Sequence, residues 1–316
     1  MKLTKVINLL FAVAMVAFMT TACSKDEKDD KIPDSSSIQQ LVKDEITMES
    51  SSEDALSDAN DVLSKDNTKN LQNLPCNAVI DSTFSIGLDT VTYTITFNGL
   101  NCAGTKKKTG SLSIKKKVSD HWSMAGTTVF ITFNNLKIEK APNGIPNGNW
   151  LILNGTKIWK NVSGGLIKNL SGTGSVVYTV AGSLQATFND NTNRTWNVNR
   201  QFTYTGNYAN NDLTLSLSGL GSTPDYNNLV VWGTNRHGEN FYTQINQTVV
   251  HKQKWGWDPV SGIKIHQIPS DNKKATITFG YNNNNQVVTD PNIRPTHLKV
   301  DWVKGSYSGT IFLALP

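Results

Sequence analysis

The sequence is poor in the residue types that build most catalytic and metal-binding sites. Its 316 residues include five histidines and three cysteines, and only two glutamates, Glu139 and Glu239, follow residue 75. No two histidines have the spacing of a metal-binding pair. The glycine-rich phosphate and dinucleotide loops and the Gly-x-Ser-x-Gly elbow of hydrolases are also missing. We therefore expect no metal, no cofactor and no catalytic residue.

Long apolar runs are scarce too, and the longest one lies near the beginning of the chain. Lys2 and Lys5 precede an apolar stretch at residues 7–19, which has the length of a secretion signal and is shorter than the roughly 20 residues that span a bilayer. Residues 20–23 resemble the cleavage site of bacterial lipoproteins. The pattern predicts a signal peptide over residues 1–22 and lipidation of Cys23, palmitate included. An ordinary signal peptide is the alternative.

Charge is divided unevenly along the chain. Residues 23–75 carry thirteen acidic residues and six lysines, a net charge of −7, whereas residues 76–316 carry twelve acidic and twenty-two basic residues, a net charge of +10. The charged run at residues 24–31 resembles the export tag that follows the acylated cysteine of surface lipoproteins, although such runs are often plain spacers. We expect a lipid anchor in the outer membrane with the protein on the cell surface, or facing the periplasm if the run is a spacer.

Residues 23–75 have the composition of a flexible acidic stalk with short helical segments. Two groups of apolar residues recur at helical spacing: Ile38, Leu41, Val42 and Ile46, and then Ala55, Leu56, Ala59, Val62 and Leu63. Ser52, followed by two acidic residues, has the pattern of a helix start. The stalk is therefore predicted to hold one or two short helices, which could dock on the following domain.

Residues 76–316 have the pattern of an all-β ectodomain. Runs such as residues 90–97, 127–133 and 212–217 alternate apolar residues with Thr, Ser or Lys, as strands with one solvated face do. Asn98-Gly99, Asn143-Gly144, Asn154-Gly155 and Gly164-Gly165 are typical of the turns between strands. The fold class predicted is a large antiparallel meander that forms a sandwich or an open barrel-like sheet.

Cys76 and Cys102 are the two cysteines that remain once Cys23 is acylated. An even pair in an exported protein indicates a disulfide. This bond would close a loop of about 25 residues and stabilise the fold by roughly 3 kcal/mol in the chain-entropy model. No histidine lies near either cysteine at the spacing of a metal site.

The order and spacing of several short segments resemble a known family. These segments are residues 98–104, 107–112, 125–135 and 153–156, Arg194-Thr195-Trp196 with Arg200, and residues 275–280. Together they resemble a broad family of uncharacterised lipoproteins of the Bacteroidota. The resemblance implies an exported, lipidated, all-β protein, and it implies no reaction.

Two groups of residues are candidates for ligand binding. The first is aromatic and could form a platform for sugar rings: Trp232, Tyr242, Trp255 and Trp257. The last two are two residues apart and would share one face of a strand. The second group could contact phosphate or acidic sugar: Lys106, Lys107 and Lys108. Packing of the aromatic residues in the core and protection of a sheet edge by the lysines are the alternatives.

The function predicted is contact with a glycan or an anionic surface polymer such as lipopolysaccharide, or a structural part in the envelope, rather than catalysis or nucleic-acid binding. A glycoside-active domain is the alternative from the enzyme class. It would use Glu239 with Asp225 or Asp258 across one bond. Ser82 and Thr90, each next to an aspartate, match a short acceptor pattern for O-glycosylation. The sequence specifies neither the ligand nor the oligomeric state.

Overall fold

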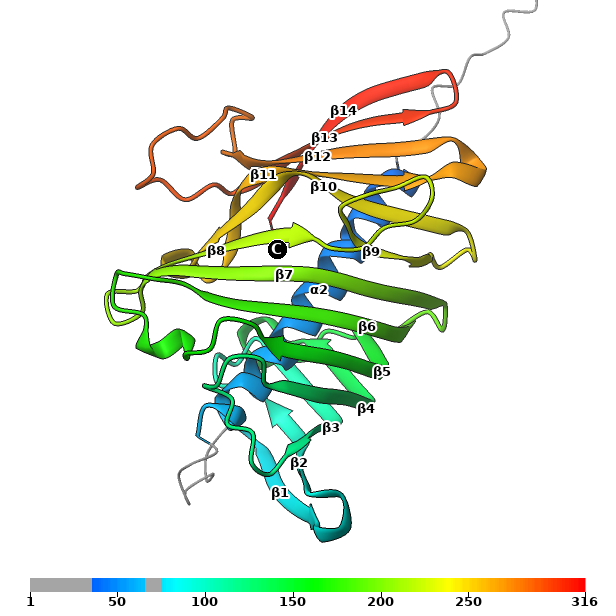
Figure 1. Ribbon diagram of the computed structural model, residues 1–316. Helices are drawn as coiled ribbons and strands as arrows, with labels where there is room; N and C mark the ends of the chain where they lie inside the picture. Colours follow the sequence, from blue (N-terminus) through cyan, green and yellow to red (C-terminus); the bar gives the residue numbers. More distant parts are fainter. Residues whose placement is uncertain (1–35, 66–74, 316) are drawn as a thin grey trace, which may run out of the picture. The chain divides into compact units, whose positions relative to one another are not determined.

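The computed structural model describes residues 36–65 and 75–315, which contain one long helix, α2 (Ser36–Leu63), and 14 strands of a single sheet (Figure 1). The strands are β1 (Ala78–Ser85), β2 (Thr90–Leu100), β3 (Lys106–Lys117), β4 (Thr128–Lys140), β5 (Trp150–Asn161), β6 (Val176–Phe188), β7 (Asn193–Asn207), β8 (Asp212–Gly219), β9 (Leu229–Thr234), β10 (Asn240–Lys252), β11 (Asp258–Ile268), β12 (Lys273–Tyr281), β13 (His297–Lys304) and β14 (Tyr307–Ala314). Short 3-10 helices occupy some connections: η1 (Ile86–Leu88), η2 (Pro142–Gly144), η3 (Ile167–Asn169), η4 (Gln253–Trp255) and η5 (Pro269–Asp271). The predicted all-β fold is confirmed.

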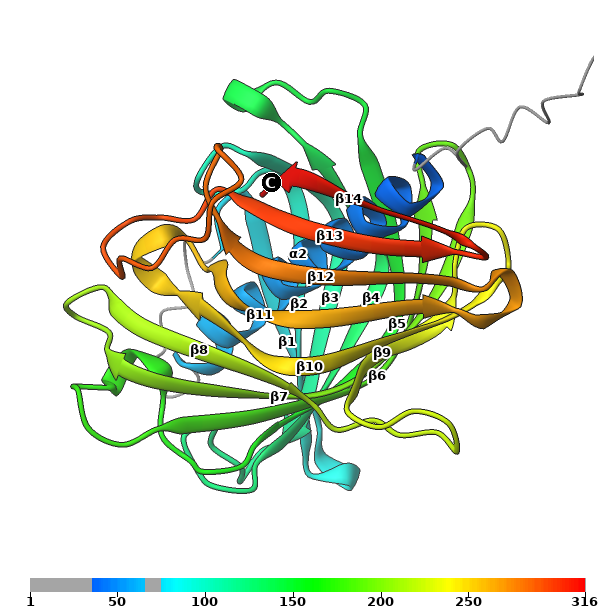
Figure 2. The same ribbon diagram turned by 90° about the horizontal axis from the view of Figure 1, so that it is seen from above.

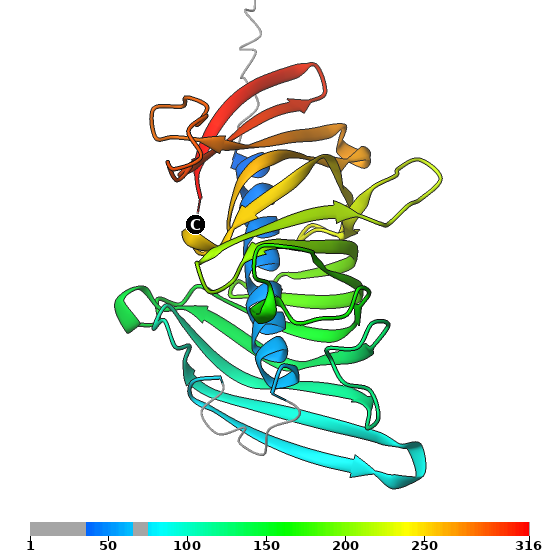
Figure 3. The same cartoon turned by 60° about the vertical axis from the view of Figure 1, so that its left-hand side comes forward.

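The strands form a meander, so most neighbours in the sheet are also neighbours in the sequence. The order runs from β1 to β8 and then from β10 to β14, while β9 pairs with both β10 and β7. Among the described pairings none joins β1 to β14, so the sheet is open. Figures 2 and 3 show it curving around α2. Of the two predicted architectures, the open curved sheet is found and the two-sheet sandwich is not.

Strand β2 illustrates how the sequence builds this sheet. Val91, Tyr93, Ile95 and Phe97 are buried, and the threonines between them are half-buried or exposed on the other side. Because side chains alternate between the two faces of a strand, this pattern gives the sheet one apolar face and one solvated face. The apolar face is the concave one that surrounds α2 (Figure 2).

Two of the predicted turns lie inside strands instead. Asn98-Gly99 is part of β2, and Asn154-Gly155 is part of β5. A Cβ atom at Gly155, whose φ is +127°, would lie 2.3 Å from the carbonyl oxygen of Ser183 on β6. Glycine is therefore needed here for the close approach of two strands. The other two predicted turns, Asn143-Gly144 and Gly164-Gly165, do lie in connections.

For residues 23–75 the predicted helix and its docking on the β domain are found in the part that the structure describes, but this part is a single long helix and not a flexible stalk. Residues 36–63 form one continuous helix, and its apolar side belongs to the same core as the sheet. Ser52, predicted as a helix start, is fully buried in the middle of this helix. Packing against the sheet stabilises the helix through this serine-rich segment, since tertiary contacts override weak helix propensity. No helix among the described residues is both long and apolar enough to cross a membrane.

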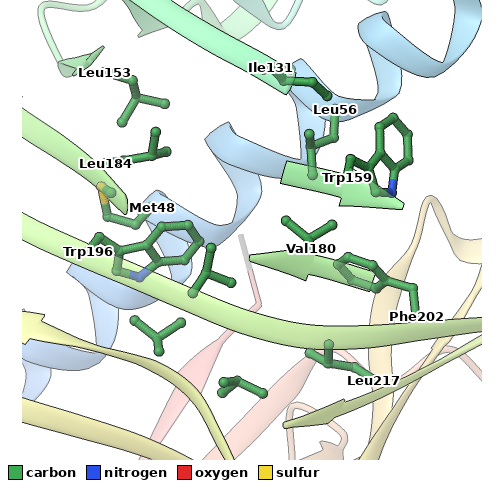
Figure 4. Close-up of a cluster of buried hydrophobic side chains, with 14 of the residues drawn as sticks. Met48, Leu56, Ile131, Leu153, Trp159, Val180, Leu184, Trp196, Phe202 and Leu217 are labelled. Atoms are coloured by element: carbon green, nitrogen blue, oxygen red, sulfur yellow. The ribbon is translucent and has the colours of Figure 1, made fainter. Parts of the chain in front are cut away.

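The core joins the helix to the middle strands (Figure 4). Met48 and Leu56 of α2 are buried next to Trp159 of β5, Trp196 of β7 and other apolar side chains of the concave face. The helical periodicity read from the sequence correctly predicts the buried positions: Leu41, Val42, Ala55, Leu56, Ala59, Val62 and Leu63. The helix therefore forms part of the hydrophobic core of the β domain.

The predicted disulfide is confirmed, with the sulfur atoms of Cys76 and Cys102 2.07 Å apart. It connects Cys76, two residues before β1, to the turn between β2 and β3. Next to it, the side-chain amide of Asn77 donates a hydrogen bond to the carbonyl oxygen of Leu100, with a donor–acceptor distance of 2.7 Å. The edge strand β1 is therefore attached at its first residues by a covalent bond as well as by its pairing with β2.

Replacing both cysteines, as Cys76→Ser with Cys102→Ser, should lower the free energy of unfolding by about 3 kcal/mol, because the unfolded chain regains the entropy of the open loop. Urea unfolding of both proteins, with and without a reducing agent, measures the difference. The reducing agent should destabilise the unmodified protein and leave the double variant unchanged. Equal stability of the two oxidised proteins would contradict the prediction.

Candidate functional site

An acidic helix lies against a basic sheet in this protein. α2 carries seven acidic residues and one lysine. Cationic side chains of the sheet form these ion pairs with it: Asp44–Arg236, Glu45–Arg194, Glu49–Arg200, Glu49–Lys264, Glu53–Arg200, Asp54–Lys106, Asp54–Lys108 and Asp58–Lys108. Six of the twenty-two basic residues of the β domain are therefore paired with acids of the helix.

The middle of this interface is a cluster of two acids and two bases. The Arg200 guanidinium is fully buried and pairs with Glu53 and with Glu49, its Nη1 atom lying 3.2 Å from Oε1 of Glu49. Nζ of Lys264 is 2.5 Å from the other oxygen of Glu49. Burial by itself would raise the pKa of Glu49, but Lys264 and Arg200 outweigh it and lower that pKa to about 2. Glu49 is therefore ionised at any physiological pH.

Lys157 of β5 lies in the same interior, and no carboxylate among residues 36–65 and 75–315 forms an ion pair with it. Its ammonium group donates a hydrogen bond to the hydroxyl of Ser52 and lies 4.6 Å from the centre of the Trp196 ring. Burial and the nearby positive charge of Arg200 lower the pKa of Lys157 to about 7. At neutral pH this lysine is therefore only partly protonated.

His266 of β11 is a second buried group whose charged form is disfavoured. Its Nδ1 atom is 2.7 Å from the hydroxyl oxygen of Thr243, and its ring stacks on Phe241 with the ring centres 5.1 Å apart. Burial, together with the positive charges of Arg194 and Lys264, lowers the pKa of His266 to about 3. It therefore acts as a neutral packing and hydrogen-bonding residue.

A cavity of about 660 Å³ lies between α2 and the sheet. Its sheet wall is largely apolar and is formed by these residues of β7, β8 and β12: Phe202, Tyr204, Leu215, Leu217, Ile277 and Phe279. The helix supplies a mostly polar wall that includes Glu49, Glu53 and Ser57. Trp159 also lines the cavity, and its buried indole N–H has no hydrogen-bond partner among the described residues. The cavity thus combines an apolar patch of the sheet with a wall of polar and charged side chains, which include Asp61, Lys168 and Lys264.

The structure divides the predicted lysine cluster between the two faces of β3. Lys106 and Lys108 face the helix, where Lys108 is buried and lies 2.5 Å from Asp58 and 2.7 Å from Asp54. Lys107, between them, is exposed. A joint anion-binding role for all three is therefore wrong, because two of the three ammonium groups already neutralise carboxylates of the same chain.

The predicted aromatic platform is also separated into two places. Trp232 and Tyr242 are partners across β9 and β10, and Tyr226 stacks on Tyr242 with the ring centres 4.5 Å apart. Trp255 lies in η4 and Trp257 follows it in a left-handed conformation, so the prediction that both lie on one strand is wrong. About ten residues of β10, roughly 30 Å of strand, separate the two pairs. Of the four aromatic residues, Trp257 is the one that lines the cavity, where it contacts Tyr204 edge to face.

The carboxylates of the predicted glycosidase do not converge. Glu239 and Asp258 flank β10 at its opposite ends, roughly 40 Å apart by the length of the strand. Glu239 accepts a hydrogen bond from the side-chain amide of Asn235, and Asp258 pairs with Arg294. Asp225 is exposed on the loop between β8 and β9. Within residues 36–65 and 75–315, no three His, Cys, Asp or Glu side chains are placed to hold a metal ion.

The remaining predicted sites concern modification. Ser82 is exposed on the edge strand β1, and Thr90 is half-buried at the start of β2. O-glycosylation at these residues stays a prediction. Cys23, the signal peptide and the charged run at residues 24–31 lie outside the described residues.

Sequence reasoning missed the buried cations that face the helix, although a signal for them exists. Lys157, Arg200 and Lys264 each occupy a position that the period-two pattern of its strand directs toward the core. A cation at an inward position requires an acidic partner or an aromatic face when it is buried. The acidic residues of α2 supply the partners, but the sequence does not show which acid meets which base.

The buried Lys157 should make stability depend on pH. Its pKa is about 7 in the folded protein and 10.5 in the unfolded chain. The unfolded state therefore binds more protons between these pH values, and stability rises as the pH rises through this window. Lys157→Met should remove that rise and stabilise the protein at pH 7 and below. Urea unfolding of both proteins from pH 6 to 10 measures the free energy of unfolding at each pH.

Lys160→Met, at an exposed position on the same strand, is the matched control and should keep the pH dependence of the unmodified protein. A stability profile of Lys157→Met that runs parallel to that of the unmodified protein would show that this lysine is charged in the folded state at all these pH values.

Comparison with known proteins does not place this chain in a family. No protein-family model, no curated protein and no solved structure matches it. The resemblance of residues 98–280 to lipoproteins of the Bacteroidota therefore stays a prediction that rests on those residues.

Proposed function

We propose that this protein is a lipid-anchored lipoprotein of the outer membrane, exposed on the cell surface, whose β domain binds an amphiphilic molecule in the cavity between α2 and the sheet. The anchor and the address rest on Cys23 and the charged run at residues 24–31, as the sequence predicts. The binding function rests on the cavity, whose volume of about 660 Å³ is in the range of small-molecule sites in proteins.

The character of the walls supports an apolar ligand body. Phe202, Leu215 and Phe279 present apolar side chains to the cavity, while the acids Glu49 and Glu53 of the opposite wall are already paired with Arg200. A charged ligand group next to Glu49 or Glu53 would compete with these pairs. An acyl chain gains hydrophobic free energy by filling the space and disturbs none of them.

The unpartnered indole N–H of Trp159 supports a polar end on the ligand. A buried donor without an acceptor is costly, and a ligand carbonyl or ester oxygen would satisfy it once the wall shifts to expose the nitrogen, which has almost no accessible surface in this structure. An acyl ester combines the two features that the cavity requires, an apolar chain and one hydrogen-bond acceptor. This pairing of apolar wall and free donor is the observation that carries the proposal.

Contact with glycans stays a second candidate, and the stacked rings of Tyr226 and Tyr242 favour it. Trp232 lies next to them across the strand pair, so three aromatic side chains are gathered in one place outside the cavity. Rings of this kind bind sugar faces in many proteins.

The cavity proposal predicts that filling the cavity removes binding. Leu215→Trp places a large ring in the apolar wall and should weaken the binding of a fluorescent acyl ester at least tenfold. Ser216→Trp, on the opposite face of the same strand, should leave the affinity unchanged. Titration of each protein with the ester, monitored by fluorescence, measures both affinities, and melting curves check that each variant is folded.

A third variant tests the polar end of the ligand. Trp159→Phe keeps a ring in place but removes the N–H group, so it should weaken the ester several-fold and leave a hydrocarbon of equal length unaffected. Binding that is not saturable, or that Leu215→Trp and Ser216→Trp reduce to the same extent, would refute the cavity as the site.

A further inference from the structure

The turn between β1 and β2 carries an exposed apolar cluster, which we call the hairpin tip and define as Phe84, Ile86 and Leu88. These side chains are 61%, 96% and 67% exposed. The turn consists of the short η1 helix and lies at one edge of the sheet, where it projects from the rest of the domain (Figures 1 and 3). Large apolar side chains gathered at such a projection require an explanation, because exposed apolar clusters mark surfaces that bind partners.

The side chains of the hairpin tip are not part of the hydrophobic core that stabilises the fold. None of the residues of η1 is buried, and β1 is exposed over its last five residues, from Asp81 onward. Gly87 has no heavy atom within 4 Å of an added Cβ atom, so the turn is open on that side. The apolar side chains therefore face solvent at a convex point, which cannot enclose a small ligand.

Positive charge lies directly behind the hairpin tip. The end of β3 pairs with the beginning of β2, with Lys117 opposite Thr90 and Lys115 opposite Thr92. Both lysines are exposed, and Val118, which follows them, is 41% exposed. Asp89 is the acidic residue within the turn itself. The hairpin tip thus has apolar side chains at its end and positively charged lysines behind them. Protein segments that enter an anionic lipid surface have this shape and this distribution of charge.

We propose that the hairpin tip inserts into the surface of a lipid bilayer, with Lys115 and Lys117 at the level of the anionic headgroups. Apolar side chains at the tip would enter the boundary between headgroups and acyl chains, as interfacial segments do. This contact is separate from the acyl anchor predicted at Cys23 and does not depend on ligand binding in the cavity. It would hold the domain close to a membrane surface on the side of β1 and β2.

The experiment uses residues 23–316, the chain that remains after removal of the predicted signal peptide, with Cys23→Ser and a fluorescent label on Gly87→Cys. The label then lies between Ile86 and Leu88 while both side chains are kept. The protein is mixed with vesicles that contain an anionic lipid and a lipid-bound quencher. We expect a blue shift and quenching of the label. A label on Ser306→Cys, in the exposed turn between β13 and β14, should show neither effect.

Two further measurements keep the result specific. Ile86→Ser with Leu88→Ser, in the labelled protein, should raise the lipid concentration needed for half-maximal quenching roughly tenfold or more, without changing the melting temperature because both positions are exposed. Vesicles of zwitterionic lipid should bind more weakly than anionic ones, and Lys115→Gln with Lys117→Gln should remove that difference.

Absence of quenching at position 87, or equal quenching in the doubly substituted serine variant, would overturn the proposal. A blue shift that appears without vesicles and grows with protein concentration would also overturn it, because the hairpin tip would then be covered by a second copy of the chain.

Discussion

The contact between the acidic side of α2 and the basic concave face of the sheet is the interaction on which the rest of this structure depends. An open sheet with an apolar inner face needs a second layer to cover that face, and α2 is the element that lies there. Its apolar residues enter the common core, and its carboxylates neutralise Arg200, Lys264 and Lys108. Without these acids the interior would hold several unpaired cations, each costly to bury.

The same contact explains why a cavity exists. A helix of 28 residues is about 42 Å long but only about 10 Å wide, whereas 14 strands, spaced about 4.8 Å apart, form a much wider surface. One helix cannot fill the whole concave face. Where the wall belongs to β7, β8 and β12, the space that the helix leaves is lined by apolar side chains. The paired charges hold the helix beside this space, so the cavity is a consequence of the fold and also its best candidate site.

The position of charge in the molecule changes how its composition is understood. The net charge of +10 on residues 76–316 suggests a surface that attracts anionic polymers. In the structure, many of those cations lie inside and meet the helix, and others, such as Lys115 and Lys117, lie at the outer side near the hairpin tip. The basic groups left for partners are therefore fewer and more localised than the composition implies.

Local patterns in the sequence determined much of the fold. Period-two alternation specified the strands and their buried faces, and helical spacing specified the buried side of α2. Two cysteines in a chain predicted to be exported specified the Cys76–Cys102 bond. The strand and helix patterns depend on residues that are close together in the sequence, and the disulfide prediction depends on the number of cysteines. Both kinds of information can be read from the sequence alone. The glycosidase pair and the aromatic platform were misplaced because the sequence analysis did not identify Asn240–Lys252 as one long strand, which puts Glu239 and Tyr242 near one end and Trp257 and Asp258 at the other.

Only the tertiary structure decided that residues 36–63 form the inner layer of the β domain rather than part of a stalk, that Lys157, Arg200 and Lys264 face that layer, and that a cavity remains beside it. These features arise from residues separated by about 100 positions or more, such as Ser52 and Lys157 or Glu49 and Lys264. The free energy of such contacts depends on burial and on the charge opposite. The burial of these side chains and the approach of the opposite charges both occur only when the sheet has curved around the helix.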